Sequence, residues 1–254
     1  MQTTGHIALV TGGGSGIGLA LASTLAARNN TVVIGGRDQR KLNWASGEVP
    51  ALHTAHLDIT DETSVQTALA DIAARFGGLT MLVNNADVAH PYQFGDHPGV
   101  AEHVADEVTT NLLGTLRVTR LALPLLERQP AAAIVTMSSV LAYVAAPSLP
   151  VYAATKAALH SFSRSLRAQL RDTTIKVFDV LPPLVDTQLA KPLPGAKLPP
   201  EAVARAVLDG IAADRYEINV AQAKQVARLS RLAPALADRA VQRALQGAAQ
   251  ASPV

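Results

Sequence analysis

A tyrosine and a lysine four residues apart give the clearest chemical signal in the sequence. Tyr152 and Lys156 lie within the predicted helix Tyr152–Arg171, so both side chains are expected on one face of that helix. An ammonium beside a phenol favours the phenolate, so we expect a lowered pKa for Tyr152 and proton exchange with an alcohol or carbonyl oxygen. Ser139 follows a buried-strand pattern at Ala131–Met137, and its hydroxyl could hold the same oxygen.

A glycine-rich segment near the N-terminus, TGGGSGIG, lies between a predicted strand at His6–Val10 and a predicted helix at Ser15–Arg28. In this setting, backbone N–H groups at the start of the helix can bind a pyrophosphate. Gly12 would permit the turn out of the strand, Gly16 a close approach to the phosphates, and Gly18 close packing of the helix on the sheet. The spacing differs from the G-x-G-x-x-G form, so a glycine-rich turn without a ligand is the alternative.

The end of the second predicted strand, VVIGGRDQR, bears on the type of dinucleotide. A carboxylate here would accept hydrogen bonds from the adenosine ribose, but the chain has Gly36 followed by Arg37. Gly36 removes the repulsion that a carboxylate would exert on a 2′-phosphate, and the Arg37 guanidinium can bind that phosphate. Asp38 comes one position later, where it can cap the next helix. We therefore expect NADP rather than NAD; the alternative for Arg37 is a solvated surface charge.

Strands and helices alternate along nearly the whole chain, as is typical of parallel strands joined by helical crossovers. No linker divides the sequence, so we predict a single α/β domain over residues 1–254, a Rossmann-like doubly wound parallel sheet with helices on both faces. Residues 184–198 are expected to form a substrate lid, and a helical tail is expected from about residue 222. The other predicted strands are Thr31–Ile34, Leu52–Leu57, Thr80–Val83, Ile175–Leu181 and Glu217–Val220, and the other predicted helices are Lys41–Ser46, Ser64–Phe76, Val100–Glu127 and Glu201–Ala212.

Composition excludes several classes of protein. The 254-residue chain has a formal net charge of +2 without a long run of like charge, which argues against nucleic acid as its main partner. The absence of cysteine excludes thiolate metal sites, and no metal-ligand spacing is found at His53, His56, His97 or His103. No uninterrupted apolar stretch of about 18 residues occurs, and the N-terminal segment does not read as a signal peptide. We expect a cytoplasmic protein with no membrane span and no metal.

Taken together, these motifs resemble those of the short-chain dehydrogenases/reductases. The resemblance covers roughly residues 5 to 220. It rests on TGGGSGIG, LD at Leu57–Asp58, NNAD at Asn84–Asp87, Asn111 in TTNLLG, Ser139, and YAATK at Tyr152–Lys156. Within the family, the chain looks similar to bacterial oxidoreductases annotated near D-alanyl teichoic-acid genes.

The resemblance implies a role for each matching residue. Tyr152 would be the acid/base, and Lys156 would bind the nicotinamide ribose while lowering the Tyr152 pKa. Ser139 would polarise the substrate oxygen, and Asn111 would hold a water that links Lys156 to solvent. Cofactor contacts are expected at Gly12, Gly14, Ser15, Gly16, Ile17, Gly18, Arg37, Asp58, Asn85, Ala86, Tyr152, Lys156, Pro182, Val185 and Thr187.

Three features depart from the family pattern. Asp87 and Pro183 stand where the family usually has glycine. Pro183 stiffens the chain and removes a donor, and Asp87 is interpreted as a tolerated turn substitution, because Asp adopts left-handed conformations better than most residues. The tail is longer than the common core and is either a basic helix on a membrane or, as favoured here, a helix that packs on its own subunit or a partner's. Its arginines, Arg228, Arg231, Arg239 and Arg243, alternate with Leu229, Leu232, Leu236 and Leu245.

These observations predict an NADP-dependent reductase that converts a ketone or aldehyde to an alcohol by hydride transfer. The alternatives are an NAD-linked alcohol or sugar dehydrogenase, and a non-catalytic protein that senses NADP or binds a partner. Apolar substrate contacts are expected at Val140, Leu141, Leu149 and Leu184. We also expect a homodimer or homotetramer, because Val104–Leu126 and Tyr152–Leu170 are apolar on more than one face. His160 is interpreted as a packed side chain.

Overall fold

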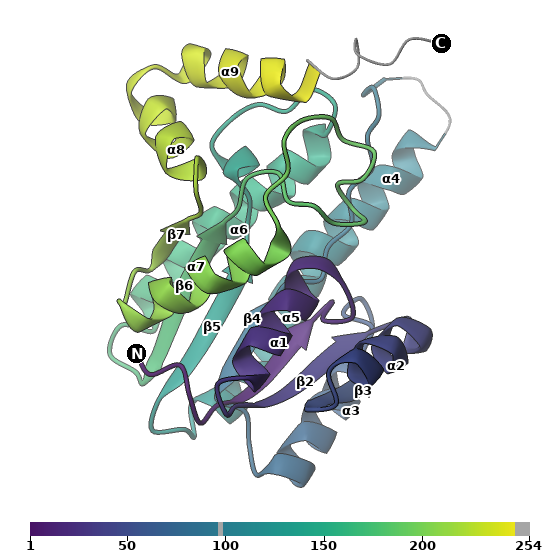
Figure 1. Ribbon diagram of the computed structural model, residues 1–254, viewed down its shortest axis with the longest axis vertical. Coiled ribbons are helices and arrows are strands. Elements are labelled where there is room, and N and C mark those ends of the chain that lie inside the picture. The colour runs from purple at the N-terminus through teal and green to yellow at the C-terminus, as the bar shows by residue number, and fades with distance from the viewer. Residues whose placement is uncertain (96–98, 247–254) are drawn as a thin grey trace.

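A parallel β-sheet of seven strands lies at the centre of the computed structural model (Figure 1). The structure describes residues 1–95 and 99–246. His97, the side chain of Leu245 and residues 247–254 of the expected domain and tail therefore lie outside the described residues.

The order of the strands is β3-β2-β1-β4-β5-β6-β7, and every neighbouring pair is parallel. The chain builds the sheet outward from β1 to β3, then returns to place β4 on the other side of β1. This reversal creates a crevice at the carboxyl ends of β1 and β4, where ligands bind in open α/β sheets. The strands are β1 Ile7–Thr11, β2 Thr31–Gly36, β3 Leu52–His56, β4 Met81–Asn84, β5 Ala132–Met137, β6 Ile175–Leu181 and β7 Glu217–Asn219.

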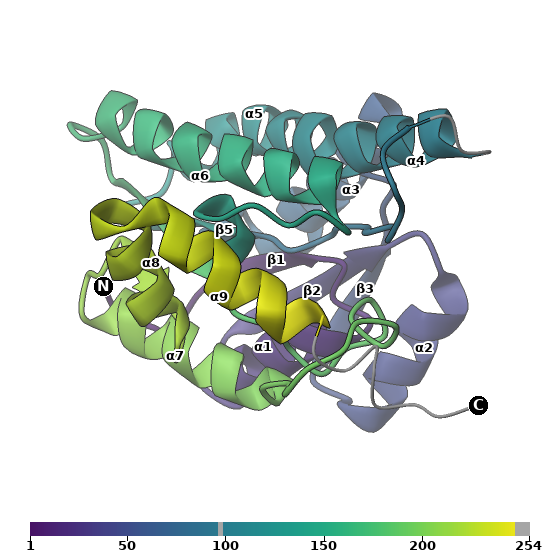
Figure 2. The same cartoon turned by 90° about the horizontal axis from the view of Figure 1, so that it is seen from above.

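Helices cover both faces of the sheet, as Figure 2 shows. The central strands are apolar along their length because both of their faces are buried: Leu9 and Val10 are neighbours in β1 but pack in clusters on opposite faces. On one face lie α1 (Gly16–Ala26), α2 (Gln39–Glu48) and α7 (Pro200–Ala212), and on the other α3 (Glu62–Phe76), α5 (Thr115–Leu126) and α6 (Pro150–Gln169). The predicted fold class, a doubly wound parallel sheet between two helical layers, is confirmed.

A third apolar cluster lies beyond the sheet, among the segments that follow its strands. It joins the short helix η2 (Val140–Ala142) to the start of α6, to the chain after β6, and to the C-terminal helices α8 (Ala223–Leu232) and α9 (Pro234–Gln246). Figure 1 shows α8 and α9 at one end of the molecule. This cluster forms one wall of the candidate site described below.

Two predicted helices differ from the structure. The stretch predicted as one helix at Val100–Glu127 is divided into α4 (Val100–Glu107), a π-helical segment η1 (Val108–Gly114) and α5. Segments of π-helix are frequent at functional sites, and this one contains Asn111. The predicted tail is broken between α8 and α9 at Pro234, because proline restricts the residue before it and lacks a backbone donor. Among the described residues, no helix combines the length and apolar character needed to cross a membrane.

Candidate active site

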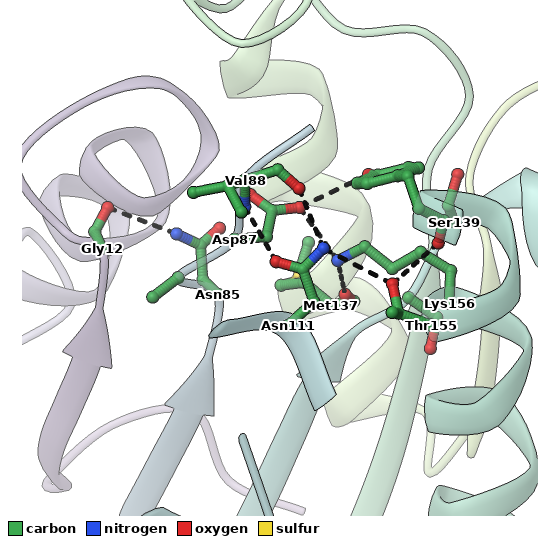
Figure 3. Close-up of polar contacts among 12 residues, drawn as sticks. Gly12, Asn85, Asp87, Val88, Asn111, Met137, Ser139, Thr155 and Lys156 are labelled. Carbon is green, nitrogen blue, oxygen red and sulfur yellow. Dashed lines mark hydrogen bonds and ion pairs between the residues drawn. The ribbon is translucent and has the colours of Figure 1, made fainter. Parts of the chain in front are cut away.

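The glycine loop lies where the ends of β1 and β4 approach each other. Gly12 has a φ of +64°, and a Cβ atom there would lie 2.8 Å from the Cα atom of Ala86. The Asn85 side-chain amide donates to the carbonyl oxygens of Thr11 at 3.0 Å and Gly12 at 3.3 Å (Figure 3). A side chain at Gly18 would overlap the Gly12 carbonyl oxygen, as expected for a glycine that brings α1 close to the sheet. The loop thus has room only for glycine at these positions.

The loop opens into a cavity of about 670 Å³, within the usual range for small-molecule sites. Thirteen of the expected cofactor and catalytic residues line it. They are Gly12, Ser15, Gly16, Ile17, Arg37, Asp58, Asn85, Ala86, Ser139, Tyr152, Pro182, Val185 and Thr187. The structure therefore brings together residues that are up to 175 positions apart in the sequence, between Gly12 and Thr187.

Two of the expected cofactor glycines do not line this cavity. Gly14 faces α2 instead, and a Cβ atom there would lie 3.4 Å from the Cβ atom of Lys41. Gly18 lies behind the loop, against the Gly12 carbonyl. Gly18 thus brings α1 close to the sheet, as expected, whereas the expected cofactor contacts of Gly14 and Gly18 stay predictions.

Two positions after β2 ends at Gly36, the side chain of Asp38 caps the next helix. Its carboxylate caps α2 by accepting from the backbone N–H groups of Arg40 at 3.0 Å and Lys41 at 3.3 Å, as predicted. Asp58 accepts from the backbone and hydroxyl of Thr60 at 2.8 and 2.7 Å. Burial acts to raise the Asp58 pKa, but the hydrogen bonds from Thr60 and the charge of Arg37 outweigh it and hold that pKa below its usual range.

Ser139 is placed by the turn that leaves β5. It caps η2, and its Oγ accepts from the Leu141 backbone N–H at 3.1 Å. The Val140 N–H donates to the carbonyl oxygen of Pro182 at 3.0 Å, so the segments after β5 and β6 are tied together. Ser139 therefore enters the cavity on a rigid turn.

Tyr152 and Lys156 lie in the first two turns of α6, which begins at Pro150, a residue well suited to the first turn of a helix. Tyr152 lines the cavity, whereas the Lys156 side chain is 2% exposed and lies behind it. The Lys156 Nζ donates to the carbonyl oxygen of Met137 at 2.8 Å and lies 5.3 Å from the centre of the Tyr152 ring. The predicted spacing thus does bring the two side chains onto one face of the helix.

Asp87 contacts both of these residues, which the sequence interpretation missed. Its Oδ2 atom lies 2.9 Å from the Lys156 Nζ (Figure 3), and it accepts a hydrogen bond from the Tyr152 hydroxyl at 3.3 Å. Asp87 is absent from the described residues with positive φ, which are Asn29, Asp214 and Ala221 among the non-glycines. The interpretation of Asp87 as a left-handed turn substitution is therefore wrong. The one available signal was its departure from the family motif.

The Tyr152 pKa is raised well above its usual range, opposite to the lowering that we expected. Burial is the largest cause, followed by the charge of Asp87, the hydrogen bond to Asp87 and the charge of Glu107. A hydrogen bond with Ser139 acts in the lowering direction but is outweighed. The expectation failed because it counted the ammonium of Lys156 but neither the burial of the phenol, the largest cause, nor the carboxylate of Asp87.

Asn111 holds the chain that follows β4. Its side-chain oxygen accepts from the Val88 N–H at 2.8 Å, and its amide donates to the Val88 carbonyl at 2.8 Å and to the Thr155 hydroxyl at 3.4 Å (Figure 3). The Asn111 side chain is fully buried and does not line the cavity. The structure thus shows it fixing the backbone next to Asp87, and its implied role in a proton relay stays a prediction.

A second buried polar cluster lies behind Ser139. The fully buried Asp179 of β6 accepts from the Ser138 hydroxyl, and its other oxygen lies 2.5 Å from the His160 Nδ1. The His160 ring also meets the Tyr143 ring edge-on at 5.1 Å. His160 is thus a packed side chain, as predicted, while the contribution of Asp179 was missed. The described residues hold no group of three or more His, Asp or Glu side chains able to bind a metal.

The rest of the cavity is apolar. Val140, Leu141, Leu149 and Leu184, the expected substrate contacts, all line it. The tail adds further lining residues that sequence reasoning missed: Gln222, Val226, Ala240, Val241 and Ala244.

The tail packs on its own chain, in agreement with the favoured alternative. Val226, Leu229 and Val241 pack against the apolar cluster beyond the sheet. The Arg231 Nη2 atom lies 3.8 Å from the Glu217 Oε2 atom. Two leucines of the tail stay exposed to solvent, Leu232 at 86% and Leu236 at 54%.

Solved structures with the same fold include two from Burkholderia. A short-chain dehydrogenase/reductase from Burkholderia phymatum, in complex with NAD, superposes with a TM-score of 0.83 at 23% identity, over 94% of this chain and 97% of that one. A short-chain dehydrogenase from Burkholderia cenocepacia J2315, in complex with NADP, gives a TM-score of 0.78 at 30% identity, over 96% of this chain and 99% of that one.

Sequence comparison points the same way. The chain is 39% identical over 189 residues to the uncharacterized oxidoreductase DltE of Bacillus subtilis, which covers 74% of this chain and 75% of that protein. The family model for short chain dehydrogenases matches residues 6–197. The chain therefore belongs to the short-chain dehydrogenase family of NAD(P)-binding oxidoreductases.

Proposed function

We propose that the protein is an NADP-dependent reductase that converts a ketone or aldehyde to an alcohol. The observation that carries this proposal is the meeting of Ser139 and Tyr152 in one cavity with the glycine loop, with Lys156 directly behind. When bound, the reduced nicotinamide supplies a hydride to the carbonyl carbon. Tyr152 donates a proton to the carbonyl oxygen, and the Ser139 hydroxyl holds that oxygen by a hydrogen bond.

The cavity has the features that a dinucleotide needs. Gly12 and Gly16 have φ values of +64° and +54°, which glycine adopts without strain, and both line the cavity at the start of α1. Thr187 packs beside Gly16, since a Cβ atom on that glycine would lie 3.0 Å from the Thr187 methyl group. These residues would hold the pyrophosphate and the nicotinamide end, and Lys156 would hold the ribose.

The preference for NADP rests on the end of β2. Gly36 places no charge there, and Arg37 lines the cavity with an exposed side chain. The Oδ1 atom of Asp38 is engaged in the cap of α2, and Asp38 does not line the cavity. A guanidinium beside a neutral residue suits a doubly charged 2′-phosphate.

The substrate is proposed to carry an apolar group beside its carbonyl. Val140, Leu141, Leu149 and Leu184 would contact that group, and Val226 and Val241 would cover it. Residues 184–198 would act as the lid within a single domain. The two ends of that segment are joined, because the Leu198 N–H donates to the Leu184 carbonyl at 2.9 Å, and loops of this kind often close over a site.

Two other functions lead to different outcomes in one experiment. The purified protein is given NADPH with a panel of ketones and aldehydes that runs from apolar to polyhydroxylated, and separately NAD with the matching alcohols and sugars, and the absorbance of the reduced cofactor is followed. We expect turnover that is faster with the apolar members. Stoichiometric NADPH binding without turnover across the panel would indicate a sensor or partner-binding protein. Oxidation of alcohols or sugars with NAD, without carbonyl reduction, would indicate a dehydrogenase.

A further inference from the structure

One carboxylate oxygen joins the two residues that would carry the proton chemistry. Oδ2 of Asp87 lies 2.9 Å from the Lys156 Nζ and accepts from the Tyr152 hydroxyl at 3.3 Å. The Asp87 side chain is 23% exposed, whereas that of Lys156 is 2% exposed, so the pair is largely shielded from water. Asp87 also lines the cavity, three positions after β4 ends at Asn84.

We propose that Asp87 is a positioning residue that keeps Tyr152 in its proton-donating form, and so extends carbonyl reduction to higher pH. The proposal rests on the proposed function for the reaction itself. The effect on Tyr152 is independent of turnover and can be measured without a substrate.

Two physical effects of Asp87 act in the same direction. An ammonium alone beside a phenol stabilises the phenolate, but the carboxylate of Asp87 offsets the charge of Lys156 at close range. The same carboxylate accepts the hydrogen bond of the phenol, and that bond exists only while Tyr152 keeps its proton. Both effects stabilise the neutral phenol.

The position of Asp87 is fixed by its surroundings rather than by its own flexibility. The next residue, Val88, is held at both its N–H and its carbonyl by the Asn111 side chain at 2.8 Å. Ala86 before it donates its N–H to the Thr11 hydroxyl at 3.0 Å. The backbone on both sides of Asp87 is therefore anchored, and its short side chain has few directions open to it.

The other charged groups near Tyr152 do not cancel this effect. Glu107, at the end of α4, is fully buried and also raises the Tyr152 pKa. Lys156 is the cation of the cluster and is already paired with Asp87. The Ser139 hydrogen bond acts in the opposite direction but does not carry a charge.

The pH range in which each direction runs follows from the proton on Tyr152. Reduction needs a donor for the carbonyl oxygen, and the neutral phenol is that donor. Oxidation needs an acceptor for the alcohol proton, and only the phenolate can accept it. A site that holds Tyr152 protonated is therefore suited to reduction over a wide pH range.

The direct test is an ultraviolet titration of Tyr152 ionisation. The chain has four tyrosines. Burial is the main cause that raises the pKa of both Tyr92 and Tyr143 to about 12, so these two contribute little phenolate at lower pH. The Tyr152 signal is the difference between each protein and its Tyr152→Phe counterpart. Asp87→Asn keeps the size of the side chain and removes its charge.

We expect the phenolate of Tyr152 to form about one to three pH units lower in Asp87→Asn than in the parent, as for loss of a neighbouring carboxylate. Asp71→Asn is the matched control, because Asp71 is exposed on α3 and pairs with Arg75. That control should titrate as the parent does. An unchanged onset in Asp87→Asn would overturn the proposal. Where Asp87→Asn does not fold, Asp87→Gly, which introduces the usual residue of the family, carries the same expectation.

The kinetic test uses pH profiles of kcat/KM in both directions. In Asp87→Asn, the loss of reductive activity at high pH should begin at lower pH. The rise of oxidative activity with pH should begin lower by the same number of pH units, because the same Tyr152 proton is given up in reduction and taken up in oxidation. A uniform loss of activity with unchanged profiles would show that Asp87 is merely structural. A protein that reduces no carbonyl, but whose Tyr152 still ionises at lower pH in Asp87→Asn, would refute the proposed function alone.

Discussion

Gly12 and Ala86 approach each other so closely that a Cβ atom on Gly12 would lie 2.8 Å from the Ala86 Cα. The contact joins the ends of β1 and β4, where the strand order reverses. Gly12→Ala should therefore lower the free energy of unfolding by at least about 1 kcal/mol, because it adds this overlap to a left-handed φ of +64°. It should also misalign the phosphate-binding loop and so weaken NADPH binding by about tenfold or more, which corresponds to about 1.4 kcal/mol of binding free energy.

The control for this variant is Gly47→Ala. Gly47 lies in α2, and a Cβ atom there meets nothing within 4 Å. This substitution should be neutral or raise the free energy of unfolding by about 0.5–1 kcal/mol. Denaturant unfolding and fluorescence titration with NADPH provide both readouts. If Gly12→Ala behaved like Gly47→Ala, the close approach of β1 and β4 would not be what requires glycine.

Tyr152→Phe should abolish most turnover while leaving NADPH binding within a few-fold. The phenol acts on the substrate oxygen, and acid/base groups of this kind contribute about 10²–10⁴ in rate. Single-turnover kinetics and binding titrations check the two halves of this prediction. Tyr216→Phe is the control, because Tyr216 stacks on Phe178 away from the cavity. More than half of the parent activity in Tyr152→Phe would remove Tyr152 from the mechanism.

Local patterns were enough to predict most of the fold and the site. The apolar runs at β1, β2 and β5, the glycine loop and the Tyr152–Lys156 spacing all depend on short-range sequence, and the structure places them as expected. The capping role of Asp38 could also be predicted from the sequence, because it depends on residues only two and three positions away.

Features that depend on contacts between distant segments were not predictable in this way. The π-helical segment η1 contains Asn111, whose side chain accepts a hydrogen bond from the backbone N–H of Val88 in the segment after β4. Asp87 and Lys156 are 69 positions apart, so the charge balance at Tyr152 could not be read from the helix alone. The tail residues that line the cavity show a helical pattern in sequence, but that pattern does not indicate which part of the protein the helices pack against.

The protein is predicted to form a dimer or tetramer. The outer sides of η1 and α6 carry exposed small or apolar residues, including Leu113 at 46% exposure and the exposed Ala157 and Ser161. Light scattering at micromolar concentration should give two or four times the mass of one chain. Ser161→Glu should shift that mass toward a single chain, because it places charge on the proposed interface. A monomeric mass for the parent protein would contradict the prediction.

The proposed preference for NADP depends on Gly36 and Arg37, and the structure has room for substitutions at Gly36. A Cβ atom on Gly36 meets Leu42 at 3.6 Å, an ordinary contact, so Gly36→Asp can be accommodated. With Arg37→Ile, it should restore a ribose acceptor and remove the phosphate partner. We expect this double variant to prefer NADH, because each charge-assisted bond is worth about 1.5–3 kcal/mol.

The most direct test of the proposed function is kcat/KM for NADPH and for NADH, measured with one accepted carbonyl substrate. For the parent protein, the account predicts a preference for NADPH of at least about tenfold, the ratio that one such bond supplies. Equal efficiencies, or a preference for NADH, would contradict the proposed binding of the 2′-phosphate by Arg37 beside Gly36, and with it the proposal that the protein is an NADP-dependent reductase.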